Sequence, residues 1–145
     1  MLDFEFIKDK IYFSKLLCEE GEDISKYSKL FDFRNPHIKR IEFNKIRNSV
    51  INQLIRSCGP LCKLSFDKIC DISSGYNVDH VIPISTNKLN KELRNLEPLN
   101  GKKVKAQSFG SNNFSNLVLA CSNCNSYKKH RILTRQEIKR ILKKN

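Results

Sequence analysis

The spacing of apolar residues predicts that the first part of the chain is helical. Between positions 4 and 17 apolar side chains recur at roughly helical intervals, Gly21 ends this stretch, and a shorter helix is expected from Asp23. Asn35-Pro36 is a helix-start signal. The helix after it should bury a stripe made of Ile38, Ile41, Ile46, Val50, Leu54 and Ile55. Residues 1–57 are therefore expected to form a helical N-terminal region.

The pattern changes in residues 58–145, where strand signals appear. Residues 76–84 (YNVDHVIPI) and 116–121 (NLVLAC) are apolar and predict two strands. The stretch between them holds a long polar insert, residues 85–113, and inserts of this length are more often functional than idle. A short helix is expected from Cys124, and Thr134 and Glu137 have the spacing of a capping box for a final helix. The expected fold class is α+β.

The positive charge is concentrated in the last third of the chain. The formal net charge is +12, and residues 101–145 hold 11 Lys and Arg against one acid, Glu137. A concentrated basic surface attracts a polyanion by releasing its counterions, which favours nucleic acid as the partner. A membrane surface, another acidic partner or a merely solvated basic face remains an alternative.

The N-terminal residues and the apolar pattern argue against a membrane protein. The first ten residues, MLDFEFIKDK, contain acids and lack the apolar core of a signal peptide. No apolar run approaches the ~20 residues of a membrane span. A cytoplasmic location without membrane association is the resulting expectation.

The spacing of the cysteines predicts a metal site. Cys121 and Cys124 form a CxxC pair, and Cys58 and Cys62 form a second pair with one more residue between them. Two short-spaced thiolate pairs are typical of a tetrahedral structural zinc site, particularly in a reducing compartment. Cys70 could replace Cys58 or Cys62, and small buried cysteines are the alternative for the whole set. Four thiolates leave zinc no open position, so any catalysis would need a second ion.

Polar residues interrupt the two predicted strands and the helix after them. Asp79 and His80 lie in the first strand, Asn116 opens the second, and Asn125 follows the CxxC pair. The resulting motifs are DHxxP, NLxxxC and CxxCNxxK, which also include Pro83, Leu117, Cys121, Cys124 and Lys128. Their conjunction resembles the HNH (ββα-metal) endonuclease family over roughly residues 58–131, about half of the chain.

The resemblance implies a divalent-metal-dependent endonuclease that hydrolyses phosphodiester bonds of double-stranded DNA. His80 would be the general base that activates water, and Asp79 and Asn125 would bind Mg²⁺ or Mn²⁺ through oxygen. Asn116 would hold the loop and orient the histidine. Neighbours on a strand point to opposite faces, so Asp79 and His80 can share a site only where the strand ends or is bulged. Taken alone, His80 could be a half-buried strand histidine and Asn125 a left-handed residue after the cysteines.

Basic and polar side chains supply candidate contacts to DNA. On the short helix that begins at Cys124 they are Lys128, Lys129 and His130. In the insert they are Lys88, Lys91, Arg94, Lys102, Lys103, Lys105, Gln107, Asn112 and Asn113.

The biological role of the predicted nuclease is inferred only by analogy with other nucleases. A free-standing nuclease with an added helical region and a long insert resembles a restriction enzyme acting as a homodimer on a short palindrome. A homing or phage-type nuclease would share the same core. The alternatives from other classes are a non-catalytic, zinc-stapled nucleic-acid-binding module and a metal-stapled protein-interaction domain.

Overall fold

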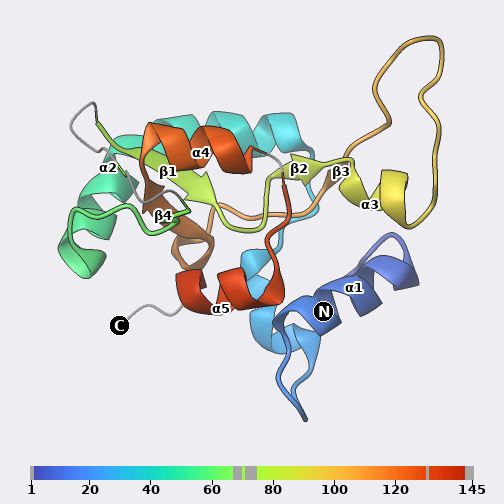
Figure 1. Cartoon of the computed structure of the whole chain (residues 1–145), viewed down its shortest axis with the longest axis horizontal. Coiled ribbons are helices and arrows are strands. Elements are labelled where there is room, and N and C mark those ends of the chain that lie inside the picture. Colours follow the sequence, from blue (N-terminus) through green and yellow to red (C-terminus); the bar gives the residue numbers. More distant parts are fainter. Residues whose placement is uncertain (1, 67–69, 71–74, 130, 143–145) are drawn as a thin grey trace.

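The protein combines helices with two small sheets, which agrees with the α+β expectation (Figure 1). The computed structural model describes residues 2–66, 70, 75–129 and 131–142. None of the described helices has the length and apolar character needed to cross a bilayer.

The N-terminal region is helical, as its pattern predicts. It contains α1 (Ile7–Leu17), the 3₁₀ helix η1 (Ile24–Leu30) and α2 (Pro36–Cys58). The Asn35 side chain caps α2 by accepting a hydrogen bond of 2.8 Å from the backbone N–H of His37. Phe13 of α1 is fully buried, and the centroid of its ring lies 5.0 Å from the ring centroid of Phe109, near the end of the insert. The helices of residues 1–57 therefore share a hydrophobic core with the rest of the chain.

The C-terminal helix α5 (Arg135–Leu142) contributes to the same core. Its Ile138 and Ile141 are buried together with side chains of α1. The predicted capping box is present: Thr134 Oγ1 accepts from the Glu137 N–H at 3.2 Å, and Glu137 Oε1 accepts from the Thr134 N–H at 3.0 Å. This local signal was therefore sufficient to place the start of the helix.

An antiparallel pair of strands forms the centre of the molecule. The strands are β1 (Asn77–His80) and β4 (Leu117–Ala120), with Asp79 opposite Val118 and His80 opposite Leu117. Helix α4 (Ser122–Lys128) directly follows β4 and contacts β1, while α2 covers the sheet with Phe43, Val50 and Leu54. Because β1 ends at His80, the condition under which Asp79 and His80 can face one site is met.

The polar insert folds back on itself. Strands β2 (Ser85–Thr86) and β3 (Gln107–Ser108) pair antiparallel and bring its two ends together. Between them lie α3 (Lys88–Glu92) and a long loop, and residues 87–106, here called the insert arm, project from the body (Figure 1). After the insert, the short 3₁₀ helix η2 (Phe114–Asn116) leads into β4.

Two of the insert's candidate DNA contacts are used inside the protein. Arg94 forms an ion pair of 2.8 Å with the buried Asp9 of α1, and Gln107 accepts a 2.7 Å hydrogen bond from Arg94. Gln107 also donates to Asp9 at 2.9 Å. Arg94 and Gln107 thus attach the insert to α1, and a contact of either side chain with DNA stays a prediction.

The predicted apolar stripe of α2 is only half correct. Val50 and Leu54 are buried, but Ile38, Ile41 and Ile46 are 41–47% exposed. The buried face instead begins with Lys39, whose ammonium donates to three backbone carbonyls, those of Asp32 (2.6 Å), Ile84 (3.2 Å) and Gly110 (2.7 Å). Hydrogen bonds of this kind allow a lysine to be buried where the carbonyls would otherwise lack donors.

The Lys39 contacts lead to a prediction about stability. Lys39→Met should keep most of the side-chain volume but lower the free energy of unfolding by about 3 kcal/mol, because buried carbonyls lose a charged donor. Urea denaturation would measure this, with the exposed Lys45 of the same helix changed to Met as the control. Equal midpoints for the two variants would show that the buried ammonium does not stabilise the fold.

Candidate metal centre and catalytic hollow

Four cysteines from distant parts of the chain meet at one point. They are Cys62, Cys70, Cys121 and Cys124, and their sulfur atoms all lie within 4.8 Å of one another. Four sulfurs about 2.3 Å from a zinc ion would be separated by about 3.8 Å, so the cluster is close to the size of a tetrahedral zinc site. The cluster could therefore hold a metal ion such as zinc.

The composition of the cluster corrects one predicted ligand. Cys58 ends α2 and is not part of the group, and Cys70 takes its place. The alternative left open by the sequence is thus the arrangement that the structure contains. The reason is geometric: Gly59 has φ +79 and ends α2, so Cys58 belongs to the helix and Cys62 to the turn that follows.

Hydrogen bonds and burial show how the second cysteine pair is presented. Cys121 is the N-cap of α4, and its sulfur accepts from the backbone N–H of Cys124 at 3.4 Å. The six cysteines form no disulfide with one another, and the sulfurs of Cys70 and Cys124 are 3.6 Å apart. Burial and the neighbouring sulfurs raise the pKa of Cys70 to about 12, because adjacent thiolates repel one another without a cation. A bound cation would offset this repulsion between neighbouring thiolates.

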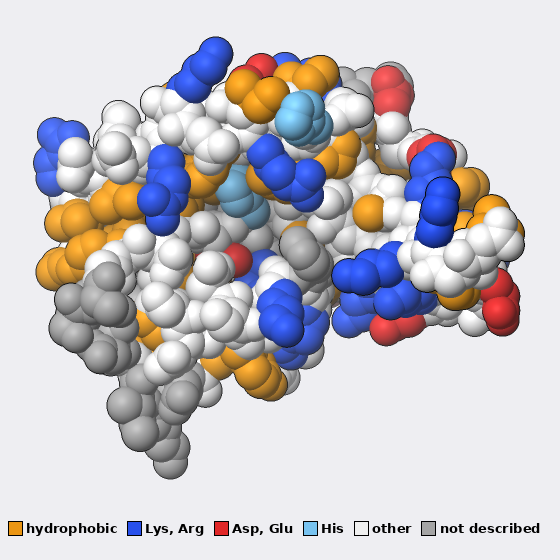
Figure 2. Space-filling view, turned by 90° about the horizontal axis from the view of Figure 1, so that it is seen from above, with side chains coloured by type: hydrophobic (Ala, Val, Ile, Leu, Met, Phe, Trp, Pro, Cys, Tyr) orange, Lys and Arg blue, Asp and Glu red, His pale blue; other side chains and the backbone are white. Residues whose placement is uncertain are grey.

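A hollow of about 170 Å³ lies where β1 ends, beside the middle and the C-terminal end of α4. Among the residues that line it are Asp79 and His80 from β1, Asn125 and Lys129 from α4 and the turn after it, and Arg40 from α2. Three of the four predicted catalytic residues therefore share one cavity. Lys and Arg side chains lie on both the body and the projecting part of this face, with a recessed histidine between them (Figure 2).

Asp79 is a buried carboxylate whose charge is only partly compensated. The residue is 5% exposed, and Lys128 Nζ lies 3.2 Å from its Oδ2. Among the described residues no donor makes an aligned hydrogen bond to that oxygen. Burial raises the pKa of Asp79 to about 6, although the charge of Lys128 opposes the rise. Asp79 and Asn125 both line the hollow, and a carboxylate and an amide oxygen are donors that a hard divalent cation prefers.

His80 is held as a neutral imidazole. Burial lowers its pKa to about 4, the charges of Lys128 and Lys39 add to the effect, and a hydrogen bond with Asn112 opposes it. His80 Nε2 lies 2.8 Å from Asn112 Oδ1, and the ring packs edge-on against Phe43 with centroids 4.7 Å apart. At pH 7 the ring is therefore in the form that can accept a proton.

Asn116 is fully buried and holds the loop after β1, which is one of its two predicted roles. Its side chain accepts from the N–H of Ile82 at 2.8 Å and donates to the carbonyls of Ile82 (3.0 Å) and Ser111 (2.9 Å). The polar partner of the His80 ring is Asn112 rather than Asn116. The sequence analysis counted Asn112 only among possible DNA contacts, and its spacing carries no signal for this other role.

Lys128 and Lys129, two further candidate DNA contacts at the end of α4, differ in burial. Lys128 is 1% exposed and donates to the backbone carbonyl of His80 at 3.0 Å, so the prediction that it contacts DNA is wrong. Lys129 is exposed at the hollow, and it has the left-handed φ of +48, whereas Asn125 lies within helix α4. His130 lies outside the described residues.

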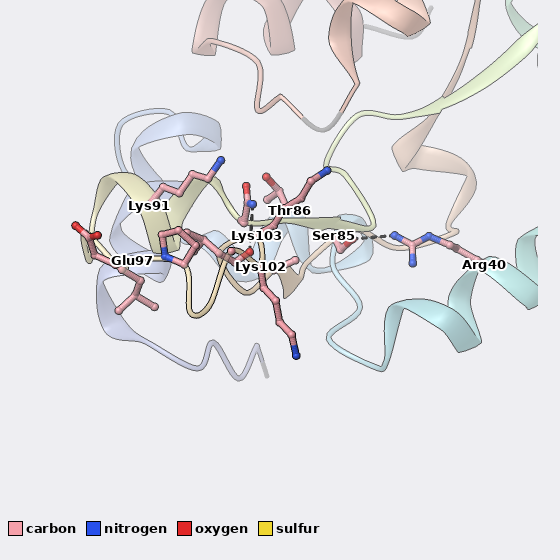
Figure 3. Close-up of a pocket in the computed structure, with 13 residues that line it drawn as sticks. Arg40, Ser85, Thr86, Lys91, Glu97, Lys102 and Lys103 are labelled. Carbon is pink, nitrogen blue, oxygen red and sulfur yellow. Dashed lines mark hydrogen bonds between the residues drawn. The ribbon is translucent and has the colours of Figure 1, made fainter.

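A second, larger hollow of about 790 Å³ lies along the insert arm. Its lining includes Lys91, Lys102 and Lys103, and it shares Arg40 and Ser85 with the hollow that contains Asp79 and His80 (Figure 3). Arg40 donates to Ser85 Oγ at 2.8 Å where the two hollows meet. Lys105 is exposed but lines a different hollow, together with Asp3 and Glu5.

The described residues thus form three neighbouring features. They are a cysteine cluster at the start of α4, a hollow with a buried carboxylate and a neutral histidine, and a basic hollow beside it. Comparison with protein-family models, with curated proteins and with solved structures finds no match for this chain.

Proposed function

We propose that the protein is a divalent-metal-dependent endonuclease of the HNH type that hydrolyses phosphodiester bonds of double-stranded DNA. The observation that carries the proposal is the single hollow that contains Asp79, His80 and Asn125. These residues come from a strand and a helix separated by the whole insert, yet all three line the same hollow. Hydrolysis of a phosphodiester needs this combination.

Each residue has a distinct role in the proposed reaction. His80 accepts the proton of the attacking water, and its neutral state at pH 7 suits that task. Asp79 and Asn125 would hold Mg²⁺ or Mn²⁺ through oxygen, and such an ion supplies charge stabilisation for the phosphate and the departing oxygen. Lys129, exposed beside the hollow, contributes a further positive charge toward the phosphate.

The cysteine cluster serves the site as a scaffold in this proposal. Zinc held by Cys62, Cys70, Cys121 and Cys124 would fix the turn from β4 into α4. Asn125 directly follows Cys124, so the same ion would fix the position of a catalytic ligand. Structural zinc and catalytic Mg²⁺ are thus assigned to separate sites.

The basic hollow beside the site supports DNA as the substrate. Arg40, Lys91, Lys102 and Lys103 line a path that continues from the catalytic hollow along the insert arm. Cations along a continuous groove bind the backbone of a polyanion several phosphates long. The projecting arm also suits sequence-specific cleavage of the restriction type by a homodimer on a palindrome, and a homing or phage-type role would use the same chemistry.

One observation favours the non-catalytic nucleic-acid-binding alternative. Lys128 already lies 3.2 Å from Asp79, so the carboxylate has a partner without any metal ion. A binding module would use this pair only to stabilise the fold. The two functions differ in one outcome, namely whether DNA is cut when a divalent cation is added.

The test is a cleavage assay on supercoiled plasmid with the zinc-loaded protein. Nicked and linear products should form when Mg²⁺ or Mn²⁺ is added to the zinc-loaded protein and should be absent when no further divalent cation is added. Asp79→Asn should bind plasmid but cut it about a hundredfold more slowly, because a charged metal ligand is lost. Salt-sensitive binding without any cleavage would support the binding module and contradict the nuclease.

A further inference from the structure

We propose that Asn112 is the positioning residue of His80, and that its amide fixes the ring in the tautomer with a protonated Nε2 and a free lone pair on Nδ1. The inference deepens the proposed function and rests on it, because it assigns which nitrogen of the general base takes the proton. The hydrogen bonds of three segments, α2, β1 and the loop before η2, carry the argument.

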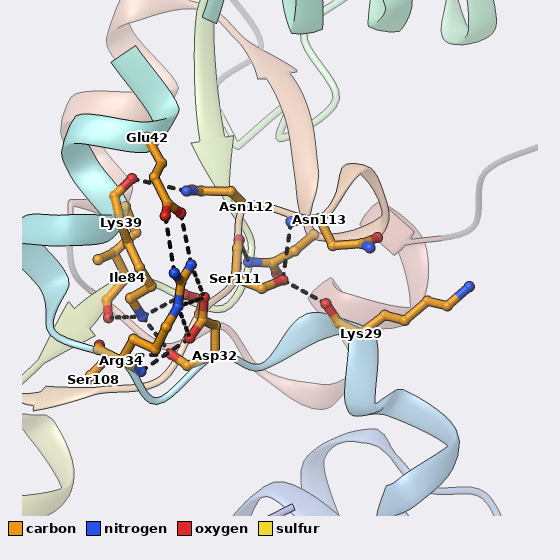
Figure 4. Close-up of polar contacts among 12 residues, drawn as sticks. Lys29, Asp32, Arg34, Lys39, Glu42, Ile84, Ser108, Ser111, Asn112 and Asn113 are labelled. Atoms are coloured by element: carbon orange, nitrogen blue, oxygen red, sulfur yellow. Dashed lines mark hydrogen bonds and ion pairs between the residues drawn. The ribbon is translucent and has the colours of Figure 1, made fainter. Parts of the chain in front are cut away.

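The orientation of the Asn112 amide is the first step. Its Nδ2 donates at 2.9 Å to the backbone carbonyl of Lys39, as drawn in Figure 4. A backbone carbonyl only accepts, so the NH₂ group must face it and the amide oxygen must face the other way. A flipped amide would bring two oxygens together at Lys39. The side of Asn112 that faces His80 is therefore its oxygen.

The tautomer of His80 follows from this orientation. Asn112 Oδ1 lies 2.8 Å from His80 Nε2, and an amide oxygen can only accept a hydrogen bond. Nε2 must then carry the hydrogen. A neutral imidazole has one N–H, so Nδ1 has the lone pair with which a general base removes a proton from water.

The anchor of this contact is rigid. Lys39 is fully buried, and its ammonium joins α2 to the carbonyls of Asp32 and Gly110 at 2.6 and 2.7 Å. On the other side, the backbone carbonyl of Ser111, the residue before Asn112, accepts from the buried Asn116 at 2.9 Å. The Asn112 amide is therefore held by a carbonyl of the anchored helix α2, and the backbone just before Asn112 is held by Asn116.

The N-terminal helical region thus takes part in the site. The carbonyl that orients Asn112 belongs to α2, and Phe43, one turn further along α2, packs edge-on against the His80 ring. The ring is restrained by one hydrogen bond and one aromatic contact from outside its own strand. Because the rotamer and the tautomer of the His80 ring are both restrained, neither has to be selected again in each catalytic cycle.

Two substitutions separate positioning from a general effect on the fold. Asn112→Leu keeps the shape of the side chain but can neither accept from Nε2 nor donate to Lys39. Asn112→Asp keeps an acceptor toward Nε2 but loses the donor to the Lys39 carbonyl, so the two substitutions separate the two contacts of the amide. The exposed Asn48 of α2, changed to Leu, is the matched control. Proton–nitrogen correlation spectra of the histidine rings report the tautomer directly, and steady-state cleavage gives kcat and KM separately.

The expected result is an Nε2–H tautomer for His80 in the wild type and in Asn112→Asp, and a mixture of tautomers in Asn112→Leu. In Asn112→Leu, kcat should fall about 10- to 100-fold with KM for DNA nearly unchanged, and Asn112→Asp should recover part of the loss. An Nδ1–H tautomer in the wild type would overturn the proposal, and so would a folded Asn112→Leu variant with wild-type spectra and kcat. If the wild type cuts no DNA, the proposed function fails, while the spectra still decide the tautomer.

Discussion

Replacing His80 by alanine is expected to lower the rate of Mg²⁺-dependent DNA cleavage by about a thousandfold, because the water loses its general base. The side chain lies in the hollow with Asp79 and Asn125 and contacts only Asn112 and Phe43 among the interactions described above. The cysteine cluster does not include His80. Single-turnover cleavage of a supercoiled plasmid at saturating protein measures the chemical step.

The chain provides a matched control for this prediction. His37 is exposed at the start of α2, and only its backbone N–H takes part in the cap of that helix. His37→Ala should therefore cut DNA at the wild-type rate. Both variants should bind DNA within about twofold of the wild type, since neither removes a cation from the groove. Equal cleavage by His80→Ala and the wild type would exclude His80 as the base.

The second large effect is expected at the cysteine cluster. Cys70→Ser should lose tightly bound zinc and cost on the order of 5 kcal/mol of folding free energy, because metal binding and folding are coupled at such sites. Cys58→Ser, which lies outside the cluster, should keep one zinc ion per chain and the wild-type midpoint of unfolding. Elemental analysis after dialysis against a mild chelator and thermal unfolding measure the two quantities.

The same pair of variants distinguishes the two possible ligand sets. Loss of zinc in Cys58→Ser with retention in Cys70→Ser would restore the spacing-based prediction and contradict the geometry of the cluster. Cys70→Ser should also lose cleavage, since the start of α4 presents Asn125. Retention of full activity without zinc would show that the cluster does not support the catalytic hollow.

Much of the fold follows from local patterns, which depend on residues close together in the chain. The cap at Asn35, the capping box of Thr134 and Glu137, and the pair Cys121 and Cys124 all act within three residues, and the structure contains each of them. The motif positions Asp79, His80 and Asn125 also lie in one hollow, as expected. Whether they catalyse hydrolysis remains a prediction for the cleavage assays.

The errors of the sequence analysis arise where a side chain acts across a long stretch of chain. Lys128 has the position and charge of a phosphate ligand, but it is buried against Asp79, 49 residues earlier. Ile38 and Ile41 are apolar yet exposed, while Lys39 between them is buried. Periodicity shows which residues share a helix face but not which face the rest of the protein covers.

By itself, the sequence predicted the α+β class, the main helices, the two central strands, a cysteine cluster that could hold a metal ion and the residue types of the candidate catalytic set, but not the strands β2 and β3 or helix α3 within the insert. Short-range sterics, capping and ligand spacing are sufficient for these features. Only the tertiary structure decided that Cys70 replaces Cys58, that Lys128 is internal and that Asn112 holds the His80 ring. These contacts join residues 32 to 54 positions apart in the pairs His80–Asn112, Lys128–Asp79 and Cys70–Cys124. Such contacts form because the backbone, the insert and the core bring the partners together, and no local pattern encodes that proximity.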